Sequence, residues 1–379
     1  MEKNSIRFAF TDDFMEDRSQ HRFLMTRLSA LGDCLVTLPL ACALRDHFPS
    51  SRIVWLTQTE NAPLLKVHKD IDEVVTVSRR WFRNPSEILR LRSKLQAEQF
   101  TTVFDPQSLS KSSGAAWLSN CHERIGLSSP VGREISPILN TVNVSVKEDS
   151  HVVDRFLALL RPLGIDNPKV SFRTPVRSES EHKIARFAEE KELLNGYTVT
   201  LPYAGWKSRQ WSMKRYGQVA ANLYGNFGIK TILPWYGDFE LKCAEEVASY
   251  SDGGAIVAEP LDIFDLTSLM RNARLVIGSD CGPMHLAASV GTPCVSLHGT
   301  TRPENSGPYG AQNIWLQMYY HGGSSRTRRT ANNAAMLAIQ VSHVMEAASK
   351  ILDKQIFSRD GHSSSARFSN SSRSRQTRK

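Results

Sequence analysis

From residue 23 onward, short runs of β-branched and aromatic residues alternate with longer stretches whose apolar positions recur at helical spacing. In the first half, four such runs predict strands, at residues 23–28, 53–57, 74–77 and 102–104. The stretch at residues 84–95 is typical of the helices between them, because Asn84 can cap its first turn and Pro85 suits the first helical position. Strands that alternate with helices of this length indicate parallel sheets covered on both faces.

The alternation fades around residues 166–178, where Pro168, Pro175 and several charges interrupt it, and then restarts. Ser212 and Asp262 stand where each can cap a helix of the second half. The second set of predicted strands lies at residues 197–201, 230–233, 255–257, 275–277 and 294–297. We therefore predict an α/β protein with two doubly wound domains, residues 23–175 and 176–333, that face each other.

The ends of the chain differ from these domains in composition. Residues 1–22 form a polar extension, residues 334–353 a last helical pattern, and residues 354–379 a Ser/Arg-rich tail that we expect to be disordered. From Ser358 onward six basic residues stand against Asp360 alone, so this segment contributes +5 of the formal charge of +9. Coulomb attraction would let the tail contact anionic lipid or nucleic acid. The simpler interpretation is a solvated tail without a specific partner.

Composition also predicts the cellular compartment of the protein. The 379 residues, 41% of them hydrophobic, suffice for two domains with a core each. No stretch approaches the ~20 apolar residues that span a bilayer, and the acidic first 21 residues do not resemble a secretory signal, so we expect a cytoplasmic protein. The six cysteines form no Cys-x-x-Cys pair, which predicts free thiols.

The first candidate for chemistry is the turn LSALGD at residues 28–33, between a predicted strand and helix. Ligands of open α/β sheets bind outside the carboxyl ends of strands, where this turn falls, and Asp33 would project there from the helix start. Alternatively, Asp33 only caps the helix and complements its positive end. Gly32 is the single glycine of a dinucleotide fingerprint here, so no dinucleotide cofactor is expected.

The second candidate is the turn SDCGPMH at residues 279–285, which joins an apolar strand to an apolar helix. The N–H groups and positive dipole end of such a helix suit a diphosphate. Gly282 permits close approach, and Pro283 is tolerated in the first helical turn. An ordinary helix capped by Asp280, with His285 as a core histidine, is the competing interpretation from spacing alone.

Two further loops follow predicted strands. In WKSRQW, residues 206–211, Lys207 and Arg209 stand between two tryptophans, and an arginine can hold phosphate oxygens with two parallel hydrogen bonds. The alternative is a solvated basic loop whose aromatic rings pack locally. In PWYGDFE, residues 234–240, Glu240 could bind the hydroxyls of a ribose, as an acid does in dinucleotide-binding folds.

One pattern imitates a metal site. Asp70 and Asp72 form an Asp-x-Asp pair, which can hold a divalent cation beside phosphates. They lead directly into the predicted strand at 74–77, and no other ligand is near them in the sequence. Acids at a strand entrance are usually solvated, so we expect no metal.

The candidate motifs occur in a fixed order between residue 23 and about residue 352. They are LSALGD (28–33) followed by Leu38-Pro39, DPQ (105–107) with Ser112, RIG (124–126), SDCGPMHLAA (279–288), and HGTTRP (298–303) ending in GPYG (307–310). This series resembles glycosyltransferase family 9, the heptosyltransferases of lipopolysaccharide core assembly.

The resemblance implies a GT-B fold, with two Rossmann-like domains and the active site in the cleft between them. The first domain would bind the acceptor and the second the nucleotide sugar, while the last helix, 334–353, would pack back on the first domain. The implied donor is ADP-heptose, transferred with inversion and without a metal. The implied acceptor is a lipid-anchored core oligosaccharide at the inner membrane face, reached by peripheral contact with anionic lipid, and no specific nucleic acid is expected.

The same resemblance assigns roles to residues. Asp33 becomes the general base that takes the proton of the acceptor hydroxyl. Arg209, where the family usually has lysine, neutralises the diphosphate together with Lys207, and Glu240 contacts the nucleoside. The turn that receives the diphosphate comprises Ser279, Asp280, Cys281, Gly282, Met284 and His285.

Two alternatives stay open at this point. The protein could be a family 9-like transferase that uses another nucleotide sugar, or another acceptor such as a different glycan or a protein. It could also be a catalytically silent protein that binds a sugar nucleotide. Asp33 together with Arg209 favours an enzyme, because binding alone needs no base directed at an acceptor.

Overall fold

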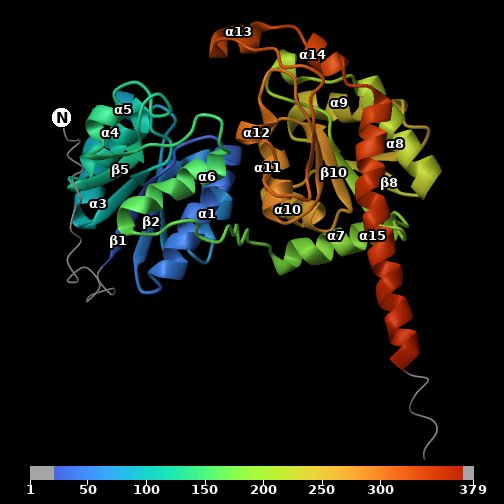
Figure 1. Cartoon of the computed structure of the whole chain (residues 1–379), viewed down its shortest axis with the longest axis horizontal. Helices are drawn as coiled ribbons and strands as arrows, with labels where there is room; N and C mark the ends of the chain where they lie inside the picture. The colour runs from blue at the N-terminus through green and yellow to red at the C-terminus, as the bar shows by residue number, and fades with distance from the viewer. Residues whose placement is uncertain (1–20, 370–379) are drawn as a thin grey trace, which may run out of the picture. The chain divides into compact units, whose positions relative to one another are not determined.

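The computed structural model describes residues 21–369, which form two compact units that meet between Pro175 and Val176 in the sequence. The division falls at the residue where the sequence pattern placed the domain boundary. Each unit holds one six-stranded sheet with helices packed against it, and the elements are labelled in Figure 1.

The N-terminal unit is built on a sheet with the strand order β3-β2-β1-β4-β5-β6, in which every pair is parallel. Its strands are β1 (Arg22–Thr26), β2 (Arg52–Gln58), β3 (Glu73–Val77), β4 (Thr102–Asp105), β5 (Glu123–Leu127) and β6 (Val142–Val144). Its helices are α1 (Leu31–His47), α2 (Ala62–Lys66), α3 (Pro85–Ala97), α4 (Ser110–Leu118), α5 (Ser136–Leu139) and α6 (Val152–Leu157), with 3₁₀ turns at Thr59–Asn61, Trp81–Arg83 and Ala158–Leu163.

The C-terminal unit repeats this plan with the order β12-β11-β10-β7-β8-β9, again parallel throughout. Its strands are β7 (Tyr197–Leu201), β8 (Lys230–Leu233), β9 (Ala255–Val257), β10 (Leu275–Ser279), β11 (Cys294–Leu297) and β12 (Ile314–Leu316). Its helices are α7 (Ser178–Glu190), α8 (Met213–Phe227), α9 (Gly237–Ser249), α10 (Ile263–Arg271), α11 (Gly282–Ser289), α12 (Pro303–Ser306), α13 (Ser325–Thr330), α14 (Ala334–Leu337) and α15 (Val341–Ser369), with the 3₁₀ turn η5 (Lys207–Arg209).

Local sequence accounts for most of these elements. The central strands β1, β7 and β10 are buried on both faces, which is why their sequences consist mostly of apolar residues and threonine. The three predicted caps are confirmed: Asn84 accepts from Ser86 and Glu87, Asp262 from Phe264 and Asp265, and Ser212 from Arg215. The pattern did not predict β5, β6 and β12. Strands β6 and β12 are short, and β5 begins with two charged residues.

The strand order reverses once in each sheet, between β1 and β4 and between β7 and β10. Ligands of doubly wound sheets bind outside the carboxyl ends of the strands at such a point. Asp33 lies in the first turn of α1, which follows β1, and residues 105–107 lie at the end of β4 and in the loop after it. The loops that follow β7 and β10 contain η5 and the start of α11. Topology therefore brings the candidate motifs of each unit to the switch point of its own sheet.

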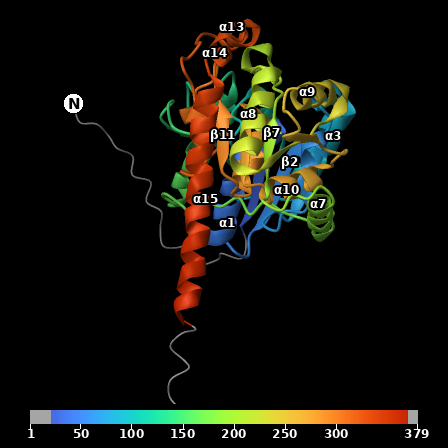
Figure 2. The same ribbon diagram turned by 90° about the vertical axis from the view of Figure 1, so that its right-hand side faces the viewer.

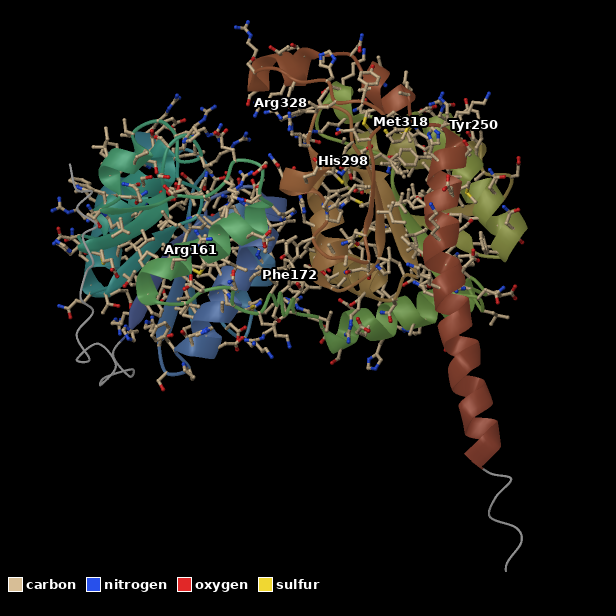
Figure 3. The ribbon with its side chains drawn as sticks, in the orientation of Figure 1. Arg161, Phe172, Tyr250, His298, Met318 and Arg328 are labelled. Carbon is tan, nitrogen blue, oxygen red and sulfur yellow. The ribbon has the colours of Figure 1, made fainter. Side chains whose placement is uncertain are left out.

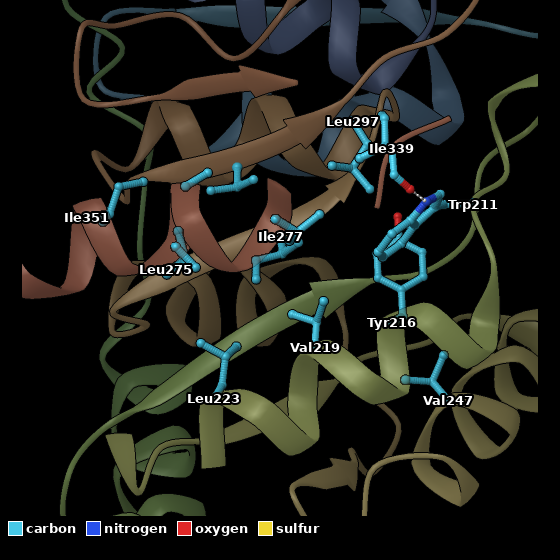
Figure 4. Packing of buried hydrophobic residues seen from close by; sticks show 14 of the residues in the cluster. Trp211, Tyr216, Val219, Leu223, Val247, Leu275, Ile277, Leu297, Ile339 and Ile351 are labelled. Carbon is cyan, nitrogen blue, oxygen red and sulfur yellow. Dashed lines mark hydrogen bonds between the residues drawn. The ribbon is translucent and has the colours of Figure 1, made fainter. Parts of the chain in front are cut away.

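The last helix packs on the sheet and on helix α8 of the C-terminal unit. The helical pattern at 334–353 is divided into α14 and α15, and α15 runs beside α8 in both views (Figure 1, Figure 2). Val344, Ala348 and Leu352 are buried in the core of the C-terminal unit. Figure 4 shows this core, with Ile351 of the same helix labelled. The C-terminal sheet therefore buries the apolar side chains of this face, and packing of the last helix on the N-terminal domain stays a prediction.

Helix α15 continues to Ser369, beyond the predicted start of the tail, and the disorder expected of the tail stays a prediction. Residues 370–379 and residues 1–20 of the polar extension lie outside the described residues. All six cysteines are free, as predicted, and all but Cys281 are buried. Among residues 21–369, no helix combines the length and the apolarity needed to cross a membrane.

Candidate functional site

At the switch point of the C-terminal unit, the loop after β7 meets the loop after β10. An Nη1 group of Arg209 lies 3.4 Å from both the carbonyl oxygen and a carboxylate oxygen of Asp280. The guanidinium also lies 3.8 Å from the centroid of the Trp206 ring, a cation–π geometry. Two of the predicted donor-binding residues, far apart in sequence, are thus in direct contact.

The turn into α11 contains backbone N–H groups that do not bond within the protein part that the structure describes. Cys281 is the N-cap of this helix, and no side chain caps it. The N–H of Met284 bonds to Cys281 O at 3.2 Å and that of Asp280 to Leu297 O at 3.3 Å. Among residues 21–369, the N–H groups of Cys281 and Gly282 have no acceptor. These two amides, at the positive end of the helix, are the ones able to bind an anion.

Asp280 is a buried charge at the base of this turn. Burial acts to raise its pKa, but the Arg209 guanidinium, assisted by His298, His285 and the Thr301 hydroxyl, outweighs that effect and holds the pKa below its usual range. The carboxylate therefore fixes Arg209 in place and cannot act as a proton donor near neutral pH. The competing interpretation, with Asp280 as the helix cap, is not what the structure shows.

His298 supports the same network from the end of β11 (Figure 3). Its Nε2 is 2.9 Å from Ser296 Oγ and its Nδ1 is 3.3 Å from Thr301 Oγ1, so both ring nitrogens are engaged. Burial of the ring lowers its pKa to about 4, although the nearby Asp280 opposes the shift. The imidazole is therefore neutral at physiological pH, and its hydrogen-bond partners within residues 21–369 are hydroxyl groups.

This neutral histidine should make the unfolding free energy depend on pH. Between the unfolded pKa of 6.5 and the folded value of about 4, the unfolded chain binds a proton that the native state does not. Stability should therefore fall as the pH falls through this window, by about 2 kcal/mol at pH 5 from this residue. Urea unfolding at pH 7.5, 6 and 5 measures the effect, and His298→Gln should make the dependence shallower by that amount. His122→Gln, at an exposed histidine, is the matched control, and an equal change in both variants would contradict the assignment.

The side chains of two residues in the predicted donor turn contact other parts of the C-terminal unit. Ser279 is fully buried, and its hydroxyl lies 2.9 Å from that of Tyr216 on α8. The Met284 side chain is buried against Gly278, where any added Cβ would approach its sulfur to 2.8 Å. These contacts hold the turn on the sheet, and direct donor contact by either side chain stays a prediction.

The loop after β8, the neighbour of β7, places Glu240 in the first turn of α9. Its Oε2 accepts from the N–H of Tyr236 at 2.8 Å. Burial raises the pKa of the carboxyl, while the Tyr236 N–H and the nearby Tyr203 hydroxyl oppose that shift. Tyr203 itself donates to Pro234 O at 3.1 Å, so it ties the loops after β7 and β8 together. Contact between Glu240 and a nucleoside stays a prediction, as does a phosphate contact for the exposed Lys207.

In the N-terminal unit, Asp33 occupies the first turn of α1 at the sheet's switch point. Its Oδ2 accepts from the Ala30 N–H at 3.1 Å, and its Oδ1 lies 2.9 Å from an Nη2 of Arg27. The side chain of Asp33 is 53% exposed, whereas that of Arg27 is 8% exposed. Asp33 therefore does contribute to the helix end, yet a large part of its carboxylate is accessible to another molecule.

Arg27, which the sequence reasoning did not consider, contacts the candidate base Asp33. The guanidinium lies 5.2 Å from the Phe156 ring, and its Nη1 donates to Pro106 O at 3.3 Å, so it is held on three sides. Gln107 Oε1 accepts from the Leu28 N–H at 2.8 Å and joins the loops after β1 and β4. A basic residue just before the LSALGD turn was the available signal.

The structure also accounts for the acids that imitate a metal site. Asp72 accepts from the N–H of Ile53 and pairs with Arg45, while Asp70 pairs with Arg173 at 2.9 Å. Asp70 forms a buried cluster with Cys42 and His68 whose ligand atoms lie within 4.8 Å of one another. The cluster does not suit a metal, since His68 Nδ1 accepts from the Asp70 N–H and Nε2 bonds to Phe172 O, which leaves no ring lone pair.

Comparison with known proteins places this geometry in context. The model of "Glycosyltransferase family 9 (heptosyltransferase)" matches residues 88–335. Lipopolysaccharide heptosyltransferase 1 of Salmonella typhimurium is 25% identical over 300 residues, 76% of this chain and 92% of the relative.

Two solved structures share the fold. A family 9 glycosyltransferase of Veillonella parvula superposes with a TM-score of 0.76 at 23% identity, over 88% of this chain and 98% of that one. The Escherichia coli heptosyltransferase WaaC with ADP-2-deoxy-2-fluoro heptose gives a TM-score of 0.68 at 21% identity, over 87% and 99%. The two parallel six-stranded sheets are thus those of a GT-B protein.

Proposed function

The chain belongs to glycosyltransferase family 9, and on that premise we propose that it transfers heptose from ADP-heptose to the inner core of lipopolysaccharide. Family membership makes the protein a glycosyltransferase. The observation that carries the more specific proposal is the Arg209–Asp280 pair beside the open amides of Cys281 and Gly282, a site suited to a diphosphate leaving group.

The proposed reaction is a single displacement with inversion. An acceptor hydroxyl oxygen forms a bond to the anomeric carbon of the heptose as the bond from that carbon to the diphosphate oxygen breaks. Asp33 takes the hydroxyl proton, and ADP leaves with the electron pair. Arg209 and the N-terminal amides of α11 stabilise the charge that develops on the diphosphate. No metal is needed in this proposal, because fixed protein charges perform that neutralisation.

Relatives support the choice of donor and acceptor. The Salmonella protein is a lipopolysaccharide heptosyltransferase, and the solved E. coli WaaC holds a fluorinated ADP-heptose. We extend both to this chain as the nucleotide sugar and the acceptor class. The proposal places the protein in the cytoplasm, at the inner membrane face where a lipid-anchored acceptor is accessible, with peripheral contact to anionic lipid.

The test is direct transfer by the purified full-length chain. Incubation with ADP-heptose and a Kdo–lipid A acceptor should release ADP and add one heptose, measured by coupled ADP detection and mass spectrometry of the lipid. Parallel reactions with UDP-glucose and GDP-mannose control for donor class. Transfer from one of these sugars instead, or from ADP-heptose only to a different acceptor, would replace the specific proposal and leave the family intact. Binding of ADP without any transfer would favour a silent binder.

A further inference from the structure

The short helix α13 brings arginines to the donor loop. Arg326, Arg328 and Arg329 occupy three of its six positions. Arg328 donates from Nη1 to Thr300 O at 3.4 Å, in the loop after β11, and Figure 3 labels it on this helix. The guanidinium carbon of Arg329 lies 4.7 Å from the centroid of the Trp206 ring. Trp206 is the residue directly before η5. The helix therefore packs against the loops that follow both β7 and β11.

Trp206 carries two guanidinium groups on one ring. Arg209 lies 3.8 Å and Arg329 4.7 Å from its centroid, so both like charges are held against the same ring. Asp280 balances Arg209, but within residues 21–369 no carboxylate forms an ion pair with Arg329. Two neighbouring cations that share one acid attract an anion, and planar guanidinium groups suit phosphate oxygens.

Two guanidinium nitrogens at this location lack a hydrogen-bond partner among the described residues. The buried Nε of Arg209 has no hydrogen-bond partner among the described residues, and the Nε of Arg328 is in the same state. Arg329 and Lys207 are exposed, and Arg302, in the loop after β11, lies 4.8 Å from the Tyr320 ring. Exposed positive charge thus lies both in η5 and on α13, at Lys207 and Arg329.

We propose that Arg329 is a phosphate-binding residue of the donor site, positioned by Trp206 so that it and Arg209 hold the diphosphate of the nucleotide sugar together. This inference rests on the proposed function for the nucleotide, but it concerns the diphosphate alone. In this arrangement α13 supplies a second guanidinium group to the leaving diphosphate. The indole ring of Trp206 holds both guanidinium groups in position through cation–π contacts.

Calorimetric titration of the full chain with ADP and with inorganic pyrophosphate tests this assignment. At a fixed ionic strength, Arg329→Gln should weaken the binding of both ligands by about tenfold. Arg329→Lys keeps the charge but not the planar stack, so it should restore the affinity only in part. Arg326→Gln is the matched control, because it removes the same charge from the same exposed helix without touching Trp206.

A double-mutant cycle with Trp206→Leu tests the positioning. If the ring holds Arg329 in place, the loss in the double variant should be smaller than the two single losses together. Equal weakening by Arg326→Gln and Arg329→Gln would show that only net charge matters, which overturns the inference. A wild-type chain that does not bind pyrophosphate would overturn it as well. Pyrophosphate binding that depends on Arg329, without preference for ADP over UDP or GDP, would support the inference while the ADP-heptose proposal fails.

Discussion

Replacing Asp33 by asparagine should lower kcat by about 10²–10⁴-fold and leave the dissociation constant for ADP within about twofold. Asparagine cannot take the acceptor proton, so a general base is lost. The predicted nucleotide contacts lie on the C-terminal unit, whereas Asp33 lies on α1 of the N-terminal unit, so donor binding should not depend on it. Initial rates with saturating donor and acceptor, together with calorimetric ADP binding, measure both quantities.

Asparagine also separates the base from the helix cap. Its side-chain oxygen can still accept from the Ala30 N–H, so the helix end keeps that hydrogen bond. What changes is the charge opposite Arg27, and since Asp33 is half exposed, the loss in stability should be only about 1 kcal/mol. Thermal unfolding of the variant checks this expectation.

Asp72→Asn is the matched control for this experiment. Asp72 belongs to the same unit, accepts from a backbone N–H, that of Ile53, and pairs with an arginine, Arg45. Its replacement removes an equivalent ion pair away from the LSALGD turn, so turnover should be unchanged. If Asp33→Asn keeps turnover within a few-fold of the wild type, the base is a different group and Asp33 serves the helix end alone.

The sequence predicted the fold well because burial leaves a clear signal in parallel sheets. Strands such as β1 and β10 are covered on both faces, and the caps Asn84 and Asp262 mark helix starts with side-chain acceptors. The packing of α15 could not be predicted in this way. An apolar helix face shows that a helix needs a partner, but its pattern does not tell which sheet it will cover.

Contacts between candidate residues could be predicted where these residues follow strand ends, but not where they depend on residues distant in sequence. Arg209 and Asp280 lie at the ends of neighbouring strands, so topology alone brings them together. Arg27 and Arg329 depend on rings distant in sequence, Phe156 and Trp206. No local pattern links such pairs, although three arginines within residues 325–330 could have drawn attention to α13.

Replacing Arg209 by glutamine should reduce kcat/KM about 10²–10³-fold and weaken ADP binding by at least about tenfold. The guanidinium lies beside the open amides of α11, and in the proposed reaction it neutralises the diphosphate as the bond to the sugar breaks. Arg209→Lys should retain more activity, because it keeps the charge and loses only the planar geometry. Steady-state kinetics with donor varied at saturating acceptor, and ADP titration, give the two values.

Glutamine at this position also leaves Asp280 buried without its main counter-charge, which can destabilise the unit. The double variant Arg209→Gln/Asp280→Asn removes both charges and so separates the two roles. If Arg209 only compensates Asp280, the double variant should recover ADP binding and turnover; if it binds the diphosphate, both should stay low while thermal stability returns. Arg271→Gln, which breaks an exposed contact with Glu181 in the same unit, is the matched control and should change neither quantity. Recovery in the double variant would assign the phosphate contact to another cation of the η5 surface, with Lys207 and Arg329 as the residues to replace next.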